Sequence, residues 1–234
     1  MIPISDDNPT RIVPFFTWAI LAACIGVFIW QVSLGENAEN RAAYTYGFVP
    51  ALLLGHAKLN AILQAPAPVL TLFTSMFMHG SWLHLAGNML YLWIFGNNVE
   101  DVMGHIRYLI FYLVCGAAAA LTHGLSNPDS TIPMLGASGA ISGVLAAYVL
   151  VFPAARVTVI LPLGILLYPM KIAAIFVVGF WFVIQLISAA MTDPSQPGVA
   201  FLAHVGGFVA GLVLTPFFKS SDVPLFGRRR GPWG

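Results

Sequence analysis

The chain has 234 residues, of which 59% are hydrophobic and only 8% are charged, and its formal net charge is +1. Because a soluble globular domain carries about a quarter charged residues, this composition excludes an ordinary soluble fold and predicts a membrane protein with several spans. A nucleic-acid partner is not expected, since the chain has no basic stripe with interleaved aromatic residues.

The N-terminal residues and the cysteines exclude two further classes of protein. The opening MIPISDDNPTR carries acidic residues where a secretory signal peptide has positive charge, so we expect the first apolar segment to be retained as a membrane span. Cys24 and Cys115 both lie inside apolar runs, a pattern that fits neither a disulfide framework nor a metal site.

The chain contains several apolar segments whose length is close to the roughly 20 residues that a spanning helix needs. Six of them are predicted to span the membrane, at about 13–34, 82–99, 106–125, 138–152, 170–191 and 199–218. We therefore expect an all-α membrane protein with a six-transmembrane-helix bundle over residues 13–218. A cytoplasmic N-terminal segment, 1–12, would precede the bundle, and a basic cytoplasmic tail, 219–234, would follow it.

The connections between these segments differ in character. Residues 35–80 form a long loop whose apolar stretch PVLTLFTSMFM is too short to span, so we expect it to lie in the membrane interface. Three prolines, Pro153, Pro162 and Pro169, argue against a continuous helix over 153–170.

The distribution of lysine and arginine indicates the orientation, because these residues are enriched in cytoplasmic loops. With the N-terminus in the cytoplasm, only Arg41 and Lys58 lie outside. The eight residues inside would be Arg11, Arg107, Arg156, Lys171, Lys219, Arg228, Arg229 and Arg230. Both termini are therefore expected in the cytoplasm.

Four polar residues fall at a similar depth in this topology, near the outer face. His84 and Asn88 lie near the start of the second segment, four residues apart and so on one helix face. Ser138 begins the fourth segment, and His204 lies near the start of the sixth. Small residues at intervals of four accompany Ser138 and His204, and such stripes let helices approach closely in a membrane.

Each of these residues also has a structural interpretation. Serine and asparagine commonly link or pack membrane helices, whereas a histidine inside a span is rare and usually functional. Together they suggest chemistry, since a histidine can accept the proton of a serine hydroxyl and make it a nucleophile. The Asn88 amide, an N–H of His84 and the Ser138 backbone N–H could then stabilise an oxyanion. No acidic residue lies at this depth, so a dyad is expected rather than a triad.

Four motifs then resemble those of the rhomboid intramembrane serine proteases. They are HGSWLHLAGN and GNNVEDVMG around the second segment, GASG at the start of the fourth, and AHVGGFVAG in the sixth. The resemblance covers nearly the whole of residues 13–218. It implies an intramembrane endopeptidase that cleaves transmembrane protein substrates near the outer membrane face, with membrane lipid as its other partner and without a cofactor or metal.

The resemblance also implies roles for individual residues. Ser138 would be the nucleophile, His204 its base, His84 and Asn88 the oxyanion-hole residues, and His79 an accessory residue nearby.

Gly136 would allow close approach to the nucleophile, and Gly207 tight packing of the sixth segment on the fourth. Residues 192–198 would form a cap, and the fifth segment, with 180–182, a lateral gate.

One departure from the family leaves a question open, because many members carry an aromatic residue where this chain has Ser142. What orients His204 is therefore not specified. A catalytically silent relative that binds membrane proteins is the alternative function, and a transporter is disfavoured because the chain shows no repeated halves. The compact layout indicates a prokaryotic plasma membrane.

Overall fold

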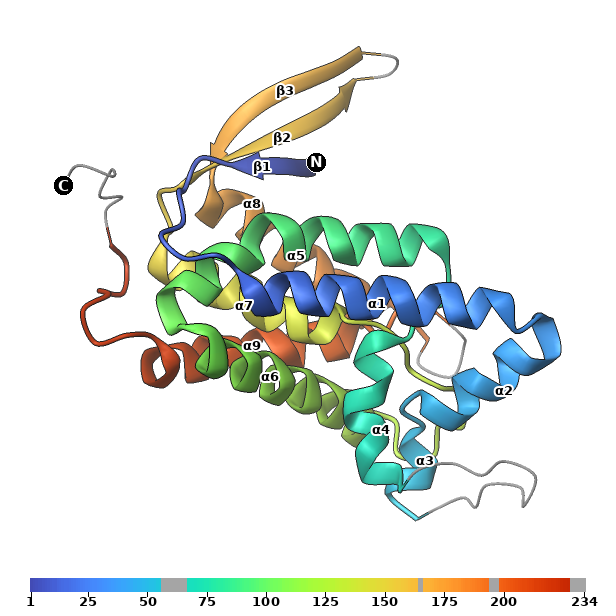
Figure 1. Ribbon diagram of the computed structural model, residues 1–234. Coiled ribbons are helices and arrows are strands. Elements are labelled where there is room, and N and C mark those ends of the chain that lie inside the picture. Colours follow the sequence, from blue (N-terminus) through green and yellow to red (C-terminus); the bar gives the residue numbers. More distant parts are fainter. Residues whose placement is uncertain (56–66, 164–165, 194–197, 228–234) are drawn as a thin grey trace.

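Helices make up most of the computed structural model, which describes residues 1–55, 67–163, 166–193 and 198–227 (Figure 1). The elements in chain order are β1 (Ile2–Asp6), α1 (Phe15–Ser33), α2 (Glu36–Tyr46), α3 (Pro50–Leu53), α4 (Pro68–Thr74), the 3-10 turn η1 (Ser75–Phe77), α5 (Trp82–Met103), α6 (His105–Ser126), α7 (Ser138–Val151), β2 (Arg156–Leu163), β3 (Leu166–Ala173), α8 (Ala174–Met191) and α9 (Phe201–Phe218).

Each of the six predicted spans overlaps a helix, but within the described residues only four helices have both the length and the apolar composition to cross a membrane. These four are α1, α6, α8 and α9. Helix α5 is long but interrupted by polar side chains, and α7 has only 14 residues. The chain is thus a mostly helical integral membrane protein, and the count of six spans stays a prediction.

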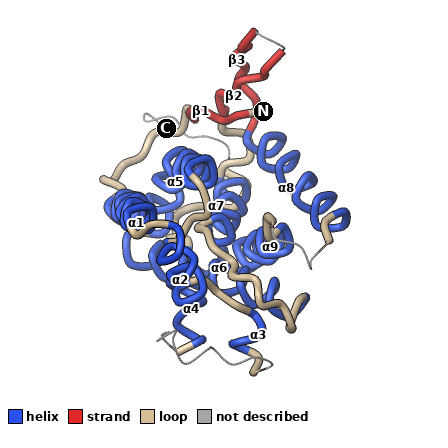
Figure 2. Tube along the Cα trace, turned by 90° about the vertical axis from the view of Figure 1, so that its right-hand side faces the viewer, coloured by secondary structure: helices blue, strands red, loops and turns tan. Residues whose placement is uncertain are grey.

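Helix α7 lies at the centre of the bundle. Twelve of its 14 residues are buried, so its short length is compatible with a position enclosed by protein rather than by lipid. Figure 2 shows α7 surrounded by α5, α6, α8 and α9, each of which contacts it.

The start of α1 is held by a side chain from α5. Pro14 at the N-cap of α1 has no side-chain acceptor to offer, and the first backbone N–H groups of a helix need one. Glu100 supplies it, accepting from the N–H groups of Phe16 and Thr17 at 2.9 and 2.8 Å. Gly104, with φ of +77°, then turns the chain from α5 into α6.

A three-stranded antiparallel sheet, in the order β1-β2-β3, corrects the all-α prediction. It projects from the helices near the start of α8 (Figure 1). Residue Met170, predicted to begin the fifth span, lies in β3, and α8 begins only at Ala174. Hydropathy alone cannot separate an apolar strand from the end of an apolar helix. Residues 156–163 and 166–170 lie in β2 and β3, so the described part of 153–170 forms no continuous helix, as expected.

The N-terminal strand ties this sheet to the central helix. Strand β1 pairs with β2, and the Tyr148 hydroxyl of α7 donates to Oδ2 of Asp6 at 2.5 Å. Burial raises the pKa of Asp6 to about 6, because a carboxylate loses hydration when it is enclosed. Residues 1–12 thus include an ordered strand, which the sequence did not predict.

The long connection between α1 and α5 is largely helical. It contains α2, α3 and α4, and the stretch expected in the interface forms α4 and η1. Lys58 and residues 228–230, used for the predicted orientation, lie outside the described residues, as do residues 194–197 of the expected cap.

Candidate active site

Ser138 and His204 come together from α7 and α9. The Ser138 Oγ lies 2.7 Å from Nε2 of His204, within hydrogen-bond distance, although 66 residues separate the two in the chain. Ser138 is the first residue of α7, so its side chain lies where the helix meets the preceding loop.

Glycines permit this approach of the two helices. A Cβ atom on Gly207 would collide with the carbonyl oxygen of Gly139, and one on Gly211 would lie 2.6 Å from Cα of Gly143. Only hydrogen at these positions allows α9 to reach α7 at this distance. The small-residue stripes seen in the sequence therefore face one another.

The opposite edge of the His204 ring contacts α8. Its Nδ1 lies 2.8 Å from Oε1 of Gln185, and the Trp181 ring packs beside the imidazole with a centroid separation of 6.0 Å and an interplanar angle of 32°. Ser142, at the position where many members of the family that this chain resembles carry an aromatic residue, donates to the Ser138 carbonyl oxygen at 2.6 Å, within its own helix.

Sequence reasoning missed Gln185. It treated α8 only as a gate containing Trp181, and Gln185 follows Trp181 by one helical turn in an otherwise apolar segment. An amide in such a segment is a signal in its own right, because a buried polar group needs a partner. Its partner on α9, however, is visible only in three dimensions.

His84 and Asn88 approach the same place from α5. A Cβ on Gly136 would lie 2.7 and 2.8 Å from the Cε1 and Nε2 atoms of His84, and 3.6 Å from the Asn88 amide nitrogen. Gly136 has φ of +128°, which other residues rarely adopt, and its N–H donates to the Ser75 carbonyl oxygen at 2.9 Å. The loop before Ser138 is thus held directly against both side chains.

The Asn88 amide nitrogen has no acceptor among the described residues, although Asn88 is only 7% exposed. Asn88 lines a cavity of about 670 Å³ together with Ser138, His204, His84 and Trp181. A buried donor without a protein partner, at the wall of a cavity beside a hydroxyl group, is suited to an acceptor that arrives there.

His79 lies behind His84 rather than at the cavity wall. Its backbone is fixed by Gln31 of α1, whose side chain donates to the His79 carbonyl and accepts from its N–H, both at 3.0 Å. The two histidine rings meet edge to face with centroids 5.3 Å apart. His79 can therefore support the position of His84, and it lies outside the residues lining the cavity.

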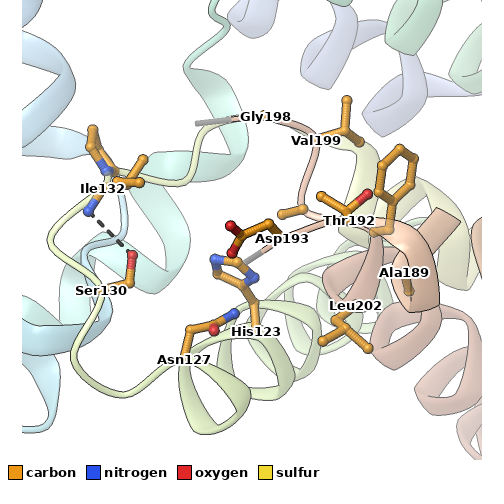
Figure 3. Close-up of a pocket in the computed structure, with 13 residues that line it drawn as sticks. His123, Asn127, Ser130, Ile132, Ala189, Thr192, Asp193, Gly198, Val199 and Leu202 are labelled. Atoms are coloured by element: carbon orange, nitrogen blue, oxygen red, sulfur yellow. Dashed lines mark hydrogen bonds between the residues drawn. The ribbon is translucent and has the colours of Figure 1, made fainter. Parts of the chain in front are cut away.

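A second, much smaller pocket of about 60 Å³ lies beside the end of α6 (Figure 3). Residues 192, 193 and 198 of the predicted cap, which the structure describes, also line it. In this view the imidazole of His123 faces the carboxylate of Asp193. Gly198, Val199 and Ala200 line both this pocket and the large cavity, so the segment just before α9 lies between the two.

Within the described residues, histidine, cysteine and acidic side chains form no cluster of three that would suit a metal ion. The prediction that the protein uses neither metal nor cofactor is not tested by this finding and stays a prediction.

The family model of the rhomboid domain matches residues 66–221, well over half of the chain. Among curated proteins, the rhomboid protease GluP of Bacillus subtilis is 26% identical over 92% of this chain and 37% of its own length. Rhomboid-like protein 11, chloroplastic, of Arabidopsis thaliana is 28% identical over 60% of this chain and 49% of its own. The rhomboid protease GlpG of Klebsiella pneumoniae is 26% identical over 85% of this chain and 61% of its own.

The chain thus spans roughly half the length of the curated relatives that it matches. Several of these relatives are named as proteases, and the identities are below 30%.

Proposed function

Because this chain belongs to the rhomboid family, we propose that it is an intramembrane serine endopeptidase acting through a dyad of Ser138 and His204. The observation that carries the proposal is the 2.7 Å approach of the Ser138 hydroxyl to Nε2 of His204. Both residues line the same cavity, so a substrate segment entering it would meet the hydroxyl directly.

The proposed reaction proceeds in two halves. As Oγ of Ser138 bonds to the carbonyl carbon of the scissile peptide, its proton moves to Nε2 of His204. The protonated ring then gives this proton to the leaving amine, the C–N bond breaks and an acyl-enzyme forms. Water, deprotonated by the same nitrogen, attacks the ester, and the serine regains its proton as the second product leaves.

The negative charge that develops on the carbonyl oxygen needs donors aimed at it. Asn88 suits this role, since its buried amide nitrogen lacks an acceptor in the described part of the chain. His84, held against Gly136, and the backbone N–H of Ser138 complete the proposed oxyanion hole. His79 would keep the His84 ring in place.

Substrates of such a site are transmembrane proteins. The proposed cleavage position is near the outer membrane face, with both termini of the enzyme in the cytoplasm, as the distribution of lysine and arginine indicates. The compact layout of the chain favours the plasma membrane of a prokaryotic cell.

Cleavage of a model transmembrane substrate in liposomes tests this function. The wild-type protein should cleave it, whereas Ser138→Ala and His204→Ala should be inactive although they fold, as judged by thermal unfolding. Equal cleavage by Ser138→Ala would refute the dyad. Failure of the wild type on varied substrates would instead favour the catalytically silent, substrate-binding alternative.

A further inference from the structure

We propose that Gln185 of α8 is the positioning residue that holds His204 in its active tautomer, so that the proposed dyad depends on a third side chain from a different helix. This inference rests on the proposed function. It also answers the question raised by Ser142, because it assigns the orientation of the base to α8 rather than to α7.

The amide of Gln185 has a defined orientation. Its Nε2 donates to the carbonyl oxygen of Trp181, one turn earlier in α8, at 3.2 Å. The amide oxygen is therefore the atom that faces His204, at 2.8 Å from Nδ1. Reversing the amide would set its oxygen against the Trp181 carbonyl oxygen, two acceptors with no hydrogen between them.

An amide oxygen can only accept a hydrogen bond, so the proton of a neutral His204 must reside on Nδ1. Nε2 then carries the free lone pair, and it is Nε2 that lies 2.7 Å from the Ser138 hydroxyl. The other tautomer would place a proton on Nε2 and a lone pair against the oxygen of Gln185. Gln185 thus selects the form in which the ring can accept the serine proton.

The burial of Gln185 supports a specific role. It is 6% exposed, and the buried residues of α8 are otherwise small or apolar, namely Ala174, Val177 and Val178. Leaving a polar amide at such a position is costly unless it is bonded. Both ends of this amide are bonded, one to its own helix and one to His204.

Trp181 adds a second contact from the same helix. Its ring lies beside the imidazole, whereas the Ser142 hydroxyl is occupied by the Ser138 carbonyl and does not reach His204. Helix α8 has the lowest buried share, 22%, of the four helices long and apolar enough to span. The base is therefore aligned by the least enclosed of these helices, and displacement of α8 would misalign it.

Substitution of Gln185 tests this role. Gln185→Leu has a similar size but no acceptor, and Gln185→Glu retains an acceptor oxygen. Two rates should be measured: cleavage of a transmembrane substrate, and labelling of Ser138 by a fluorophosphonate, which reports activation of the hydroxyl without substrate entry. Leu186→Ala is the matched control, because Leu186 is the next residue of α8 and is exposed.

We expect Gln185→Leu to lower kcat and the labelling rate by about 10²-fold or more, with KM changed less than threefold, because the ring then loses both its fixed position and its single tautomer. For Gln185→Glu, both rates should lie within about tenfold of those of the wild type. Leu186→Ala should have the same rates as the wild type. If Gln185→Leu does not fold, Gln185→Met serves the same purpose. A folded variant without an acceptor that labels and cleaves within threefold of the wild type would overturn the inference.

A measurement independent of activity separates this inference from the proposed function. Nitrogen NMR of the protein labelled at histidine should show the His204 proton on Nδ1 in the wild type, and a mixture of tautomers in Gln185→Leu. A proton on Nε2 in the wild type would refute the role of Gln185. Activity that survives in Ser138→Ala would refute the proposed function, whatever the tautomer.

Discussion

Replacing Gly207 by alanine should separate the two halves of the proposed dyad without touching either. A Cβ at this position would collide with the carbonyl group of Gly139. Neither side is a flexible side chain, so α9 must withdraw from α7 by about 1.4 Å to reach an ordinary contact distance of 3.4 Å. A matching shift at His204, one turn away, would lengthen the 2.7 Å contact between Nε2 and Oγ to about 4.1 Å, beyond hydrogen-bond range.

A displacement of this size at a reacting pair costs about 10²-fold in rate. We therefore expect Gly207→Ala to lower kcat for a transmembrane substrate by about that factor. Gly179→Ala in α8 is the matched control, because a Cβ there meets nothing within 4 Å and alanine favours a helix. If purified, folded Gly207→Ala cleaves as fast as Gly179→Ala, the glycine contact does not set the geometry of the site and the reasoning is wrong.

Three further predictions concern single side chains. Asn88→Ala should lower kcat by about 10²–10³-fold with little change in KM, because its amide would act on the transition state; equal effects on both constants would contradict this. Ser142→Ala should retain most cleavage activity, since its hydroxyl bonds only within α7, and a loss above tenfold would contradict that view. The pKa of Asp6 is raised to about 6 by burial, so its ionisation destabilises the fold as the pH rises from about 4 to 6. The difference in unfolding temperature between Asp6→Asn and the wild type should therefore shift in favour of the variant when the pH is raised from 4.5 to 7.5. The same difference at both pH values would exclude this linkage.

The elements of the bundle were predictable because their sequence signals are local. Apolar runs of about 20 residues define helices such as α1 and α6, and for these two the predicted limits differ from the observed ones by one or two residues. The polar residues Ser138 and His204 stand out against an apolar background, and the glycine stripes indicate which helix faces can approach. Function at these residues remains a proposal, but their proximity follows from signals that a sequence carries.

Features that depend on distant partners were not predictable. Gln185 looks like an isolated amide until α9 is placed beside it. The sheet has the same cause, since β1 pairs with residues about 150 positions later, and β2 and β3 are too apolar to be told from the ends of apolar helices. In the sequence, Glu100 is only one residue of a motif. In the structure, its hydrogen bonds to the start of α1 explain why a carboxylate is buried there.

The pairing of β1 with β2 also constrains how the chain threads through the bilayer. Two strands joined by backbone hydrogen bonds must lie in the same compartment, so the polypeptide between Asp6 and Arg156 crosses the membrane an even number of times. At synthesis rates of roughly 5–20 residues per second, β1 waits on the order of 10–30 s for its partner to emerge. Closure of the sheet is thus a late event in biogenesis. It requires that the number of membrane crossings already made between the two strands is even.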